Sequence, residues 1–243
     1  MTRENADAET KFGKGIIGLT GKRLAKMAEI LPATDRLADI GTDHGHLLTS
    51  LVLSQKIRRG IGVEIARGPY ERAQKNVADL GLEDRIEIRL GDGLGALAPG
   101  EATACVIAGM GGQTIIDILD RRPQVAATLP CLLLQPMSAE AQVRHYLQQT
   151  NRRITDEALV EERGTIYLIL LARRGKMKRL SPSEAEFGPL LLAERPPLFS
   201  SYVRVKTDRL AGIIDRLERS DSEESRLKQS RLKALVEEWS TLL

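Results

Sequence analysis

The chain has 243 residues, of which 42% are hydrophobic and 28% charged, with a net charge of +3 and an aromatic content of 3%. This length is enough for a full α/β core with a small appendage, and it excludes a minimal domain held only by disulfides. The low aromatic content argues against extensive stacking of unpaired bases.

The first fifteen or so residues are polar and charged and lack an apolar signal core. No apolar run in the chain approaches the roughly 20 residues that a membrane span needs. The two cysteines, Cys105 and Cys131, each lie in an apolar strand-like run, which is typical of reduced core thiols. We therefore expect a cytoplasmic protein with no membrane segment and no metal.

A first helix is expected after Thr20, which can cap it. Apolar residues then recur with helical period, at Leu24, Met27, Ala28 and Leu31, and form a face that covers the core. Basic residues on and before this helix are candidates for contacts with phosphate groups: Lys11, Lys14, Lys22, Arg23 and Lys26.

The segment Arg36-Leu-Ala-Asp-Ile-Gly-Thr-Asp-His-Gly-His46 is typical of a buried strand that runs into a glycine turn and a helix. Asp39, Gly41 and Gly45 keep an acidic-x-Gly-x-x-x-Gly spacing, which places a ligand outside the strand's carboxyl end. Asp43 stands where a dinucleotide fingerprint has its second glycine, and its charge disfavours a pyrophosphate. The loop favours a ligand with an ammonium group and no phosphate, such as S-adenosylmethionine. Taken alone, a purely structural turn explains it equally well.

Two more predicted strands end in acids. The segment Gly60-Ile-Gly-Val-Glu-Ile65 ends at Glu64, whose carboxylate can accept hydrogen bonds from both ribose hydroxyls of a nucleoside. The strand from Arg85 to Leu90 breaks at Gly91-Asp-Gly93, where Asp92 can accept a hydrogen bond from an adenine amino group. Each acid alone is also compatible with a solvated turn.

The fourth predicted strand, Ala104-Cys-Val-Ile-Ala108, leads into Gly109-Met-Gly-Gly112 and a helix from about Gln113 to Asp120. Three glycines in four positions favour close approach of the backbone to a ligand or a flat substrate. Four consecutive strand ends with ligand chemistry together predict an α/β, Rossmann-like class I methyltransferase core.

The rest of that sheet follows in order. Cys131–Gln135 is predicted as the fifth strand and Ala139–Gln149 as a helix. The segments Arg153–Glu162 and Thr165–Leu171, joined by Arg163-Gly164, predict a hairpin. A terminal hairpin that inserts one antiparallel strand completes a seven-stranded methyltransferase sheet. We expect this S-adenosylmethionine-binding domain to cover residues 1–180.

Beyond residue 180 the pattern changes to helical period. One apolar stripe is Leu210, Ile213, Ile214 and Leu217, and a second, after polar residues 220–225, is Leu232, Leu235, Val236 and Trp239. The sequence predicts a coiled-coil-like helical hairpin over residues 181–243. The positive and negative charges of this hairpin nearly balance, so the hairpin is compatible with two roles. It is either an RNA-binding arm or a hairpin that packs on the core or on a partner chain.

Four motifs resemble those of the bacterial tRNA (adenine(22)-N1)-methyltransferases: Asp39-Ile-Gly-Thr-Asp-His44, Gly68-Pro-Tyr70, Leu90-Gly-Asp-Gly-Leu94 and Ile107-Ala-Gly-Met-Gly-Gly112. The last is the most specific, because most class I methyltransferases of exocyclic amines have an Asn/Asp-Pro-Pro-aromatic loop there. The resemblance covers residues 20–175 best. Two departures from the family pattern are visible: Gly45-His46 stands for Ala-Tyr, and Met137 for Asn.

The resemblance implies an enzyme that uses S-adenosyl-L-methionine to methylate adenine N1 of tRNA, at position 22 in the D-arm region. The implied cofactor contacts are Asp39, Gly41, Thr42, Asp43, His44, Gly45, Glu64, Ile65, Asp92, Gly93, Ala108 and Gly109. Adenine N1 carries a lone pair, so the base needs orientation more than a strong general base. Gly109, Met110 and Gln135 are expected to orient it, whereas His44 and His46 are expected to shape the loop.

The expected partner is tRNA, contacted through phosphate groups, and no oligomeric state is predicted. No acid occurs from Arg163 to Arg179, and Arg173, Arg174, Lys176, Lys178 and Arg179 form a natural phosphate contact, with Lys22, Arg23 and Lys26 as further candidates. A solvated charge run at a domain boundary is the alternative. Two other functions stay open: methylation of another RNA or a small molecule, and a non-catalytic RNA-binding module that has kept the fold.

Overall fold

The structure, a computed structural model, describes residues 21–218 and 222–243. Lys11 and Lys14 lie outside the described residues. The chain divides into two compact units, Met1–Gly188 and Pro189–Leu243, and each is described by itself.

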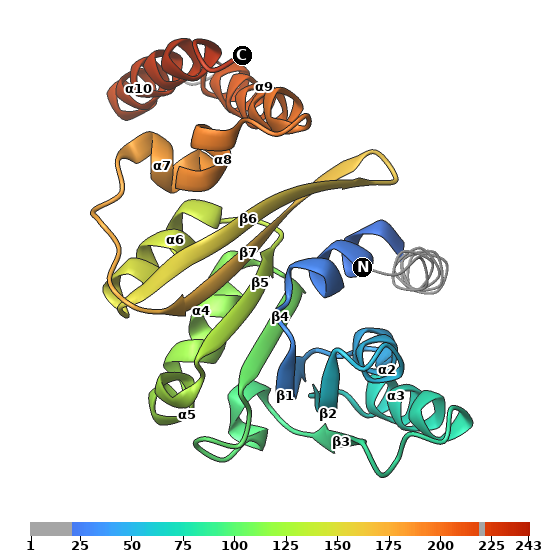
Figure 1. The fold of residues 1–243 in the computed structure, drawn as a ribbon. Coiled ribbons are helices and arrows are strands. Elements are labelled where there is room, and N and C mark those ends of the chain that lie inside the picture. The colour runs from blue at the N-terminus through green and yellow to red at the C-terminus, as the bar shows by residue number, and fades with distance from the viewer. Residues whose placement is uncertain (1–20, 219–221) are drawn as a thin grey trace, which may run out of the picture. The chain divides into compact units, whose positions relative to one another are not determined.

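The first unit is built on one seven-stranded sheet with the order β3-β2-β1-β4-β5-β7-β6 (Figure 1). The strands are β1 (Thr34–Ile40), β2 (Ile57–Glu64), β3 (Ile86–Leu90), β4 (Ala104–Met110), β5 (Cys131–Pro136), β6 (Arg152–Glu162) and β7 (Thr165–Arg174). Strands β1 to β5 are parallel, and β7 inserts antiparallel between β5 and β6. The predicted seven-stranded methyltransferase sheet is confirmed.

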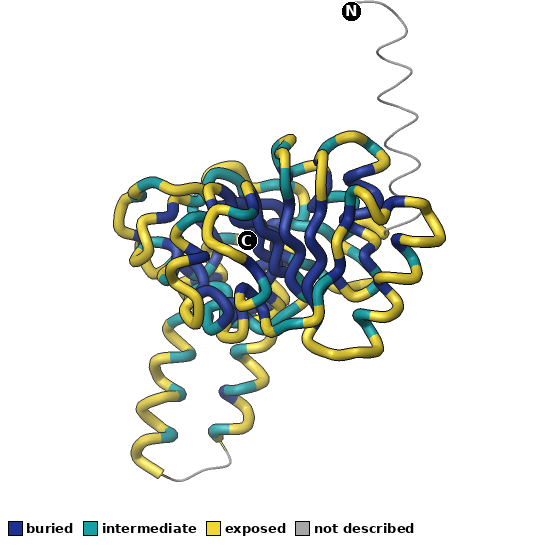
Figure 2. Tube along the Cα trace, turned by 90° about the horizontal axis from the view of Figure 1, so that it is seen from below, coloured by how far each residue is buried: buried dark blue, intermediate teal, exposed yellow. Residues whose placement is uncertain are grey.

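Helices cover both faces of this sheet (Figure 1). They are a helix over residues 21–30, α2 (His46–Leu53), α3 (Arg67–Asp79), α4 (Gly112–Asp120), α5 (Pro123–Thr128) and α6 (Glu140–Gln149). The unit also contains the 3-10 turn η1 (Gly93–Ala96) and the short α7 (Pro182–Phe187), which packs against α6. The residue 21–30 helix, α2 and α3 share one core, in which Met27, Leu48 and Val77 pack against Leu37 and Val106 of the sheet. The strands form the buried centre of the unit (Figure 2).

The order of the strands reverses between β1 and β4, which lie side by side although two strands separate them in sequence. In an open parallel sheet, the crevice at such a reversal, outside the carboxyl ends of the strands, is the usual ligand site. Apolar residues fill both faces of β1 and β4, since Leu37, Ala38, Cys105 and Val106 are all fully buried. The core therefore fixes the strands in place, and the loops at their carboxyl ends are the part of the sheet where a ligand would bind.

The second unit contains α8 (Pro189–Glu194), α9 (Phe199–Leu217) and α10 (Glu223–Ser240). Helices α9 and α10 pack against each other, with Ile214 and Trp239 of the two predicted stripes buried. The Ser222 hydroxyl caps α10 by accepting a hydrogen bond from the Ser225 amide at 3.1 Å. The predicted helical hairpin is confirmed, although part of its polar connection, residues 219–221, lies outside the described residues.

The division between the units falls after α7, whereas the sequence placed the boundary before it. Helix α7 belongs to the first unit because the Arg144 guanidinium, on α6, donates hydrogen bonds to the carbonyl groups of Ala185 at 2.8 Å and Glu186 at 3.0 Å. The same guanidinium pairs with Glu157 of β6 at 2.9 Å, and both side chains are fully buried. No helix in the described part of the chain is long and apolar enough to cross a membrane.

Candidate active site

The carboxyl ends of the parallel strands meet at one edge of the sheet. In register, Asp39 and Ile40 of β1 lie beside Gly62 and Val63 of β2 and beside Val106 and Ile107 of β4. Glu64 pairs with Leu90 of β3, and Ala108 pairs with Gln135 of β5. The structure thus gathers Asp39, Glu64, Asp92, Gly109 and Gln135 along a single edge.

Asp39 is the buried acid of this edge, with 5% of its surface exposed. Its Oδ2 accepts a hydrogen bond from the Thr42 hydroxyl at 2.8 Å. Burial raises the pKa of this carboxyl from 3.8 to about 6, and the Thr42 hydrogen bond offsets only part of that effect. A positively charged ligand group beside Asp39 would relieve the cost of ionising it.

A pocket of about 100 Å³ opens beside this acid. Its lining includes Arg23, Leu24, Met27, Asp39, Gly41, Thr42, Asp43, His44, His46, Leu47 and Ala108. Gly41 has a φ of +74°, and a Cβ there would run into the Met110 methyl group, so glycine lets the first and fourth loops touch. The His44 and His46 rings stack with their centroids 5.3 Å apart and form part of the wall.

The first loop is held in place from β2 and α3. The Asp43 amide donates a hydrogen bond to Glu64 Oε1, and the Asn76 side chain donates to the His44 carbonyl at 2.9 Å. The Asp43 carboxylate is largely exposed and lies 3.6 Å from Arg72. Glu64 therefore orients the loop with one oxygen, which leaves its second oxygen for the ribose role predicted from the sequence.

A second pocket, of about 370 Å³, lies at the end of β3. Its lining is Leu90, Gly91, Asp92, Gly93, Gly95, Ala96, Ile118, Arg121 and Arg122. Asp92 Oδ2 pairs with Arg121 at 3.0 Å, so one carboxylate oxygen is engaged and the other is left for a ligand. Leu90 is 53% exposed and Ile65, at the end of β2, is 70% exposed. Exposed apolar side chains beside polar groups suit the flat face of an adenine ring.

Sequence reasoning missed the contributions of α4 and its end to this pocket. Ile118, Arg121 and Arg122 line it, yet no motif marks them. The available signal was the position of the Arg121-Arg122 pair at the end of the helix that follows the fourth glycine loop.

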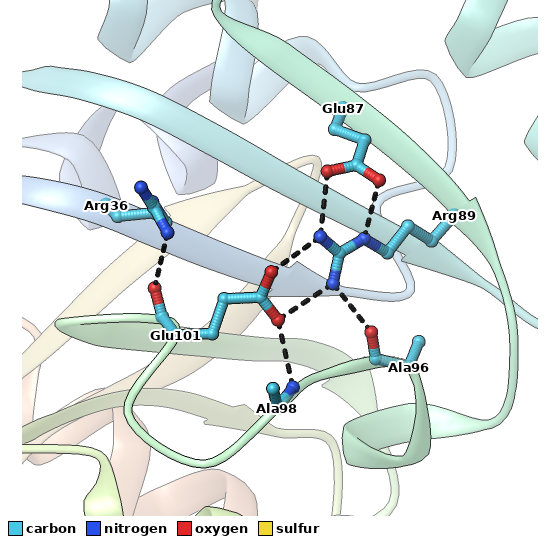
Figure 3. Close-up of polar contacts among 6 residues, drawn as sticks. All are labelled: Arg36, Glu87, Arg89, Ala96, Ala98 and Glu101. Carbon is cyan, nitrogen blue, oxygen red and sulfur yellow. Dashed lines mark hydrogen bonds and ion pairs between the residues drawn. The ribbon is translucent and has the colours of Figure 1, made fainter.

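Arg89 ties the second pocket's loop to the sheet (Figure 3). Its guanidinium donates hydrogen bonds to Glu101 Oε1 at 2.6 Å, Glu87 Oε2 at 2.8 Å and the Ala96 carbonyl of η1 at 2.8 Å. The Arg89 hydrogen bonds lower the pKa of Glu101 to about 2. Since Ala96 also packs directly over Gly91, this network fixes the shape of the loop that carries Asp92.

The fourth loop is fixed from β5. Gln135 is fully buried, and its Oε1 accepts hydrogen bonds from the Gly109 amide at 3.1 Å and from the Arg23 guanidinium at 2.6 Å. Its amide nitrogen donates to the Pro136 carbonyl at 3.2 Å. These contacts are those of a positioning residue, which holds Gly109 in the φ of +71° that glycine adopts easily.

The predicted basic residues do not gather at this edge. Arg23 lines the pocket beside Asp39, whereas Lys22 is exposed and Lys26 pairs with Glu29 at 2.9 Å. Arg173 pairs in register with Cys131, which starts β5, so Arg173, Arg174 and the chain beyond them follow from the opposite edge of the sheet. Lys178 pairs with Glu184 at 2.8 Å. RNA contact by these residues stays a prediction.

No group of three or more His, Cys, Asp or Glu side chains that could hold a metal ion is found in residues 21–218 and 222–243. Cys105 and Cys131 are buried free thiols on β4 and β5, and burial raises the pKa of both. Their chemistry is that of core residues.

The two pockets lie at the ends of strands of the same sheet, and each has an acid in its lining, Asp39 in one and Asp92 in the other. Asp39 is a buried acid that a positively charged ligand group would keep ionised, and the Gly41 turn brings the first loop against Met110 of the fourth loop. Among the described residues, Glu64 engages one carboxylate oxygen with the Asp43 amide, and Asp92 engages one with Arg121.

Known proteins are similar to this chain in both sequence and fold. A curated tRNA (adenine(22)-N(1))-methyltransferase of Bacillus subtilis is 33% identical over 217 residues, which cover 87% of this chain and 91% of that protein. A crystal structure described as the B. subtilis m1A22 tRNA methyltransferase matches with a TM-score of 0.83 and 32% identity, covering 91% of this chain and 97% of that one.

A structure from Streptococcus pneumoniae, described as a putative tRNA (m1A22) methyltransferase, matches with a TM-score of 0.83 and 33% identity, over 91% of this chain and 98% of that one. The same S. pneumoniae protein in complex with S-adenosyl-L-methionine matches with a TM-score of 0.80. The model of one family, tRNA (adenine(22)-N(1))-methyltransferase, matches residues 37–240. The chain belongs to the tRNA (adenine(22)-N(1))-methyltransferase family.

Proposed function

We propose that this protein transfers a methyl group from S-adenosylmethionine to N1 of adenine 22 in tRNA. The observation that carries the proposal is the set Asp39, Glu64 and Asp92, which lines one edge of the sheet beside the Gly109-Met110 loop in a chain of this family. With tRNA as its substrate, the enzyme would work in the cytoplasm.

The cofactor would lie along the ends of β1, β2 and β3. Asp39 would pair with its ammonium group and the second oxygen of Glu64 would accept from its ribose. The oxygen of Asp92 that does not face Arg121 would accept from its adenine amino group. Ile65 and Leu90 would cover the adenine ring, which accounts for two large apolar side chains left exposed at strand ends.

The cofactor supplies a methyl group on a positively charged sulfur. The adenine N1 lone pair forms the new carbon–nitrogen bond, the sulfur keeps the electron pair of the bond that breaks, and the positive charge moves to the base. No proton has to move in this step, so the protein needs no strong general base at the reacting atom. Its work is orientation, which supplies a large part of the rate of such reactions.

The Gly109-Met110 turn is the candidate for orienting the base. Gln135 fixes the turn through the Gly109 amide, and the Met110 carbonyl accepts from the Met137 amide at 2.8 Å. The backbone carbonyl groups of Gly109 and Met110 are the proposed acceptors for the amino group of the target adenine. A turn of glycines admits a flat ring close to the backbone, which a bulkier loop would exclude.

The RNA side of the proposal rests on basic side chains that do not line the cofactor pockets. Lys22 and Lys26 lie on the residue 21–30 helix, and Arg173 and Arg174 end β7 at the far edge of the sheet. A contact at that far edge requires an RNA that extends well beyond its target base, as a folded tRNA does.

The helical hairpin α9–α10 is proposed to help hold the tRNA. Removing residues 189–243 takes away one whole compact unit and leaves every strand-end residue of the first. The truncated protein should keep its affinity for S-adenosylhomocysteine and lose activity on tRNA at limiting RNA. Unchanged activity on tRNA would remove the hairpin from the substrate site.

The test of the function is methyl transfer from labelled S-adenosylmethionine to unmodified tRNA. We expect incorporation into a tRNA with adenine at position 22, and none when that adenine is replaced by guanine. Incorporation into ribosomal RNA alone, or into both tRNAs equally, would contradict the proposal. Cofactor binding without transfer to any RNA would favour a non-catalytic RNA-binding module.

A further inference from the structure

Arg23 makes contacts within the candidate site that its sequence position does not predict. It lines the pocket beside Asp39, and its guanidinium Nη1 donates to Gln135 Oε1 at 2.6 Å. The guanidinium carbon lies 5.5 Å from the centroid of the Tyr167 ring on β7. Its backbone amide donates to Glu162 Oε1, on β6, at 3.3 Å. Contacts with three strands therefore fix one half-buried cation at the mouth of the pocket.

The charges of this pocket match a zwitterion. The methionine tail of the cofactor ends in an ammonium and a carboxylate. The lining supplies two acids, Asp39 and Asp43, for the ammonium, and Arg23 is the only Lys or Arg among the described residues that line it. The one hydrogen bond to Gln135 uses a single N–H of the guanidinium within the described chain, which leaves other donors for a ligand.

We propose, building on the function proposed above, that Arg23 binds the carboxylate of the cofactor's methionine tail while Asp39 holds its ammonium. Arg23 then acts in cofactor recognition and not in RNA binding. A guanidinium suits this task because it can present two parallel N–H groups to one carboxylate.

The same contact links the cofactor to the loop that faces the base. Arg23 donates to Gln135, and the same Gln135 oxygen accepts from the Gly109 amide. A bound carboxylate would hold Arg23 in place, and through Gln135 it would hold the glycine turn. Arg23 is therefore also placed to couple an occupied cofactor pocket to an ordered base site.

Two other arrangements compete with this one. The backbone N–H groups at the start of α2 also face this end of the sheet and could receive the carboxylate. Arg23 could instead contact RNA, as the sequence suggested. The three arrangements differ in which ligand loses affinity when Arg23 is neutralised.

The experiment is a calorimetric titration with two ligands, S-adenosylhomocysteine and its decarboxylated analogue, which keeps the ammonium and lacks the carboxylate. The proteins are wild type, Arg23→Gln, Arg23→Lys and, as a matched loss of charge on the neighbouring exposed residue, Lys22→Gln. The ratio of the two affinities within each protein is the readout, because a general loss of folded protein affects both ligands alike.

We expect wild type and Lys22→Gln to prefer S-adenosylhomocysteine over the analogue by about 10- to 100-fold, the range of a charge-assisted hydrogen bond. Arg23→Gln should bind both ligands equally, mainly through a loss of affinity for S-adenosylhomocysteine, and Arg23→Lys should keep part of the preference. tRNA affinity without cofactor should be the same in wild type and Arg23→Gln.

If Arg23→Gln prefers S-adenosylhomocysteine over the analogue as strongly as wild type does, the proposal is overturned, and the N–H groups at the start of α2 become the site for the carboxylate. If Arg23→Gln loses affinity for tRNA while its ratio of ligand affinities stays that of wild type, Arg23 contacts RNA as the sequence suggested. Failure of the wild type to bind S-adenosylhomocysteine at all would instead refute the proposed function, so the two failures are distinguishable.

Discussion

Replacing Asp39 by Asn should make the cofactor-free protein more stable at neutral pH, although it removes a predicted ligand. Asp39 is buried, and burial raises its pKa from 3.8 to about 6. Because the pKa is raised in the folded state, the stability that the protonated carboxyl contributes is fully present below about pH 4. That contribution is lost as the pH rises through about 6.

The size of the effect follows from the two pKa values. At about 1.4 kcal/mol per tenfold change in proton affinity, the difference between 3.8 and about 6 corresponds to roughly 3 kcal/mol. The Asn side chain has the same shape and can still accept the Thr42 hydrogen bond of 2.8 Å through its oxygen. The substitution therefore removes the buried charge and little else.

The assay is urea unfolding of wild type and Asp39→Asn without cofactor, at pH 8 and at pH 4.5. We expect the variant to be more stable by up to about 3 kcal/mol at pH 8, and the difference to shrink to about 1 kcal/mol at pH 4.5. Other titrating groups cancel, because only the difference between the two proteins is compared. A variant that is equally stable or less stable at pH 8 would refute the reasoning.

Three further predictions concern the site and its surroundings. Glu64→Ala should weaken S-adenosylhomocysteine binding by about 1–3 kcal/mol in calorimetry, because it removes the acceptors of the ribose and of the Asp43 amide; Glu64→Gln, which keeps one acceptor oxygen, should lose less, and equal losses would argue against this reading. Arg89→Met should weaken the same binding by about tenfold without touching a ligand, since it frees the Ala96 carbonyl and the η1 loop; unchanged affinity would show that the loop holds its shape alone. Neutralising Arg173, Arg174 and Lys176 together should lower the log–log salt slope of tRNA binding by about 0.7–0.9 for each phosphate group that the variant no longer neutralises, with unchanged cofactor affinity, and an identical slope would place the RNA elsewhere.

The order of elements and the fold were readable from the sequence because each of the first four strands ends at or directly before a glycine or an acid. Glu64 and Asp92 stand at strand ends in the chain, and parallel pairing alone brings those ends to one edge of the sheet. The hairpin that inserts β7 next to β5 was also predictable, since Arg163-Gly164 joins two segments of strand-like composition.

Contacts between distant segments were not readable. Nothing in the sequence relates Arg23 to Gln135, because the first helix reaches the end of β5 only through packing on the sheet. The Arg89 network joins a strand residue to a loop that follows it, and its acids occupy ordinary surface-like positions in the sequence. The charge run from Arg173 onward was predicted from composition, yet the direction of β7 carries it to the edge away from the two pockets of the candidate site.

The most direct measurement of the proposed activity is the identity of the methylated nucleoside. Unmodified tRNA is incubated with the protein and S-adenosylmethionine and digested to nucleosides, and the methyladenosine isomers are resolved by chromatography and mass. We predict 1-methyladenosine, with a reverse-transcription stop at position 22, because the fourth loop is a glycine turn and lacks the clamp for an exocyclic amine. N6-methyladenosine or a methylated pyrimidine as the only product would contradict this prediction.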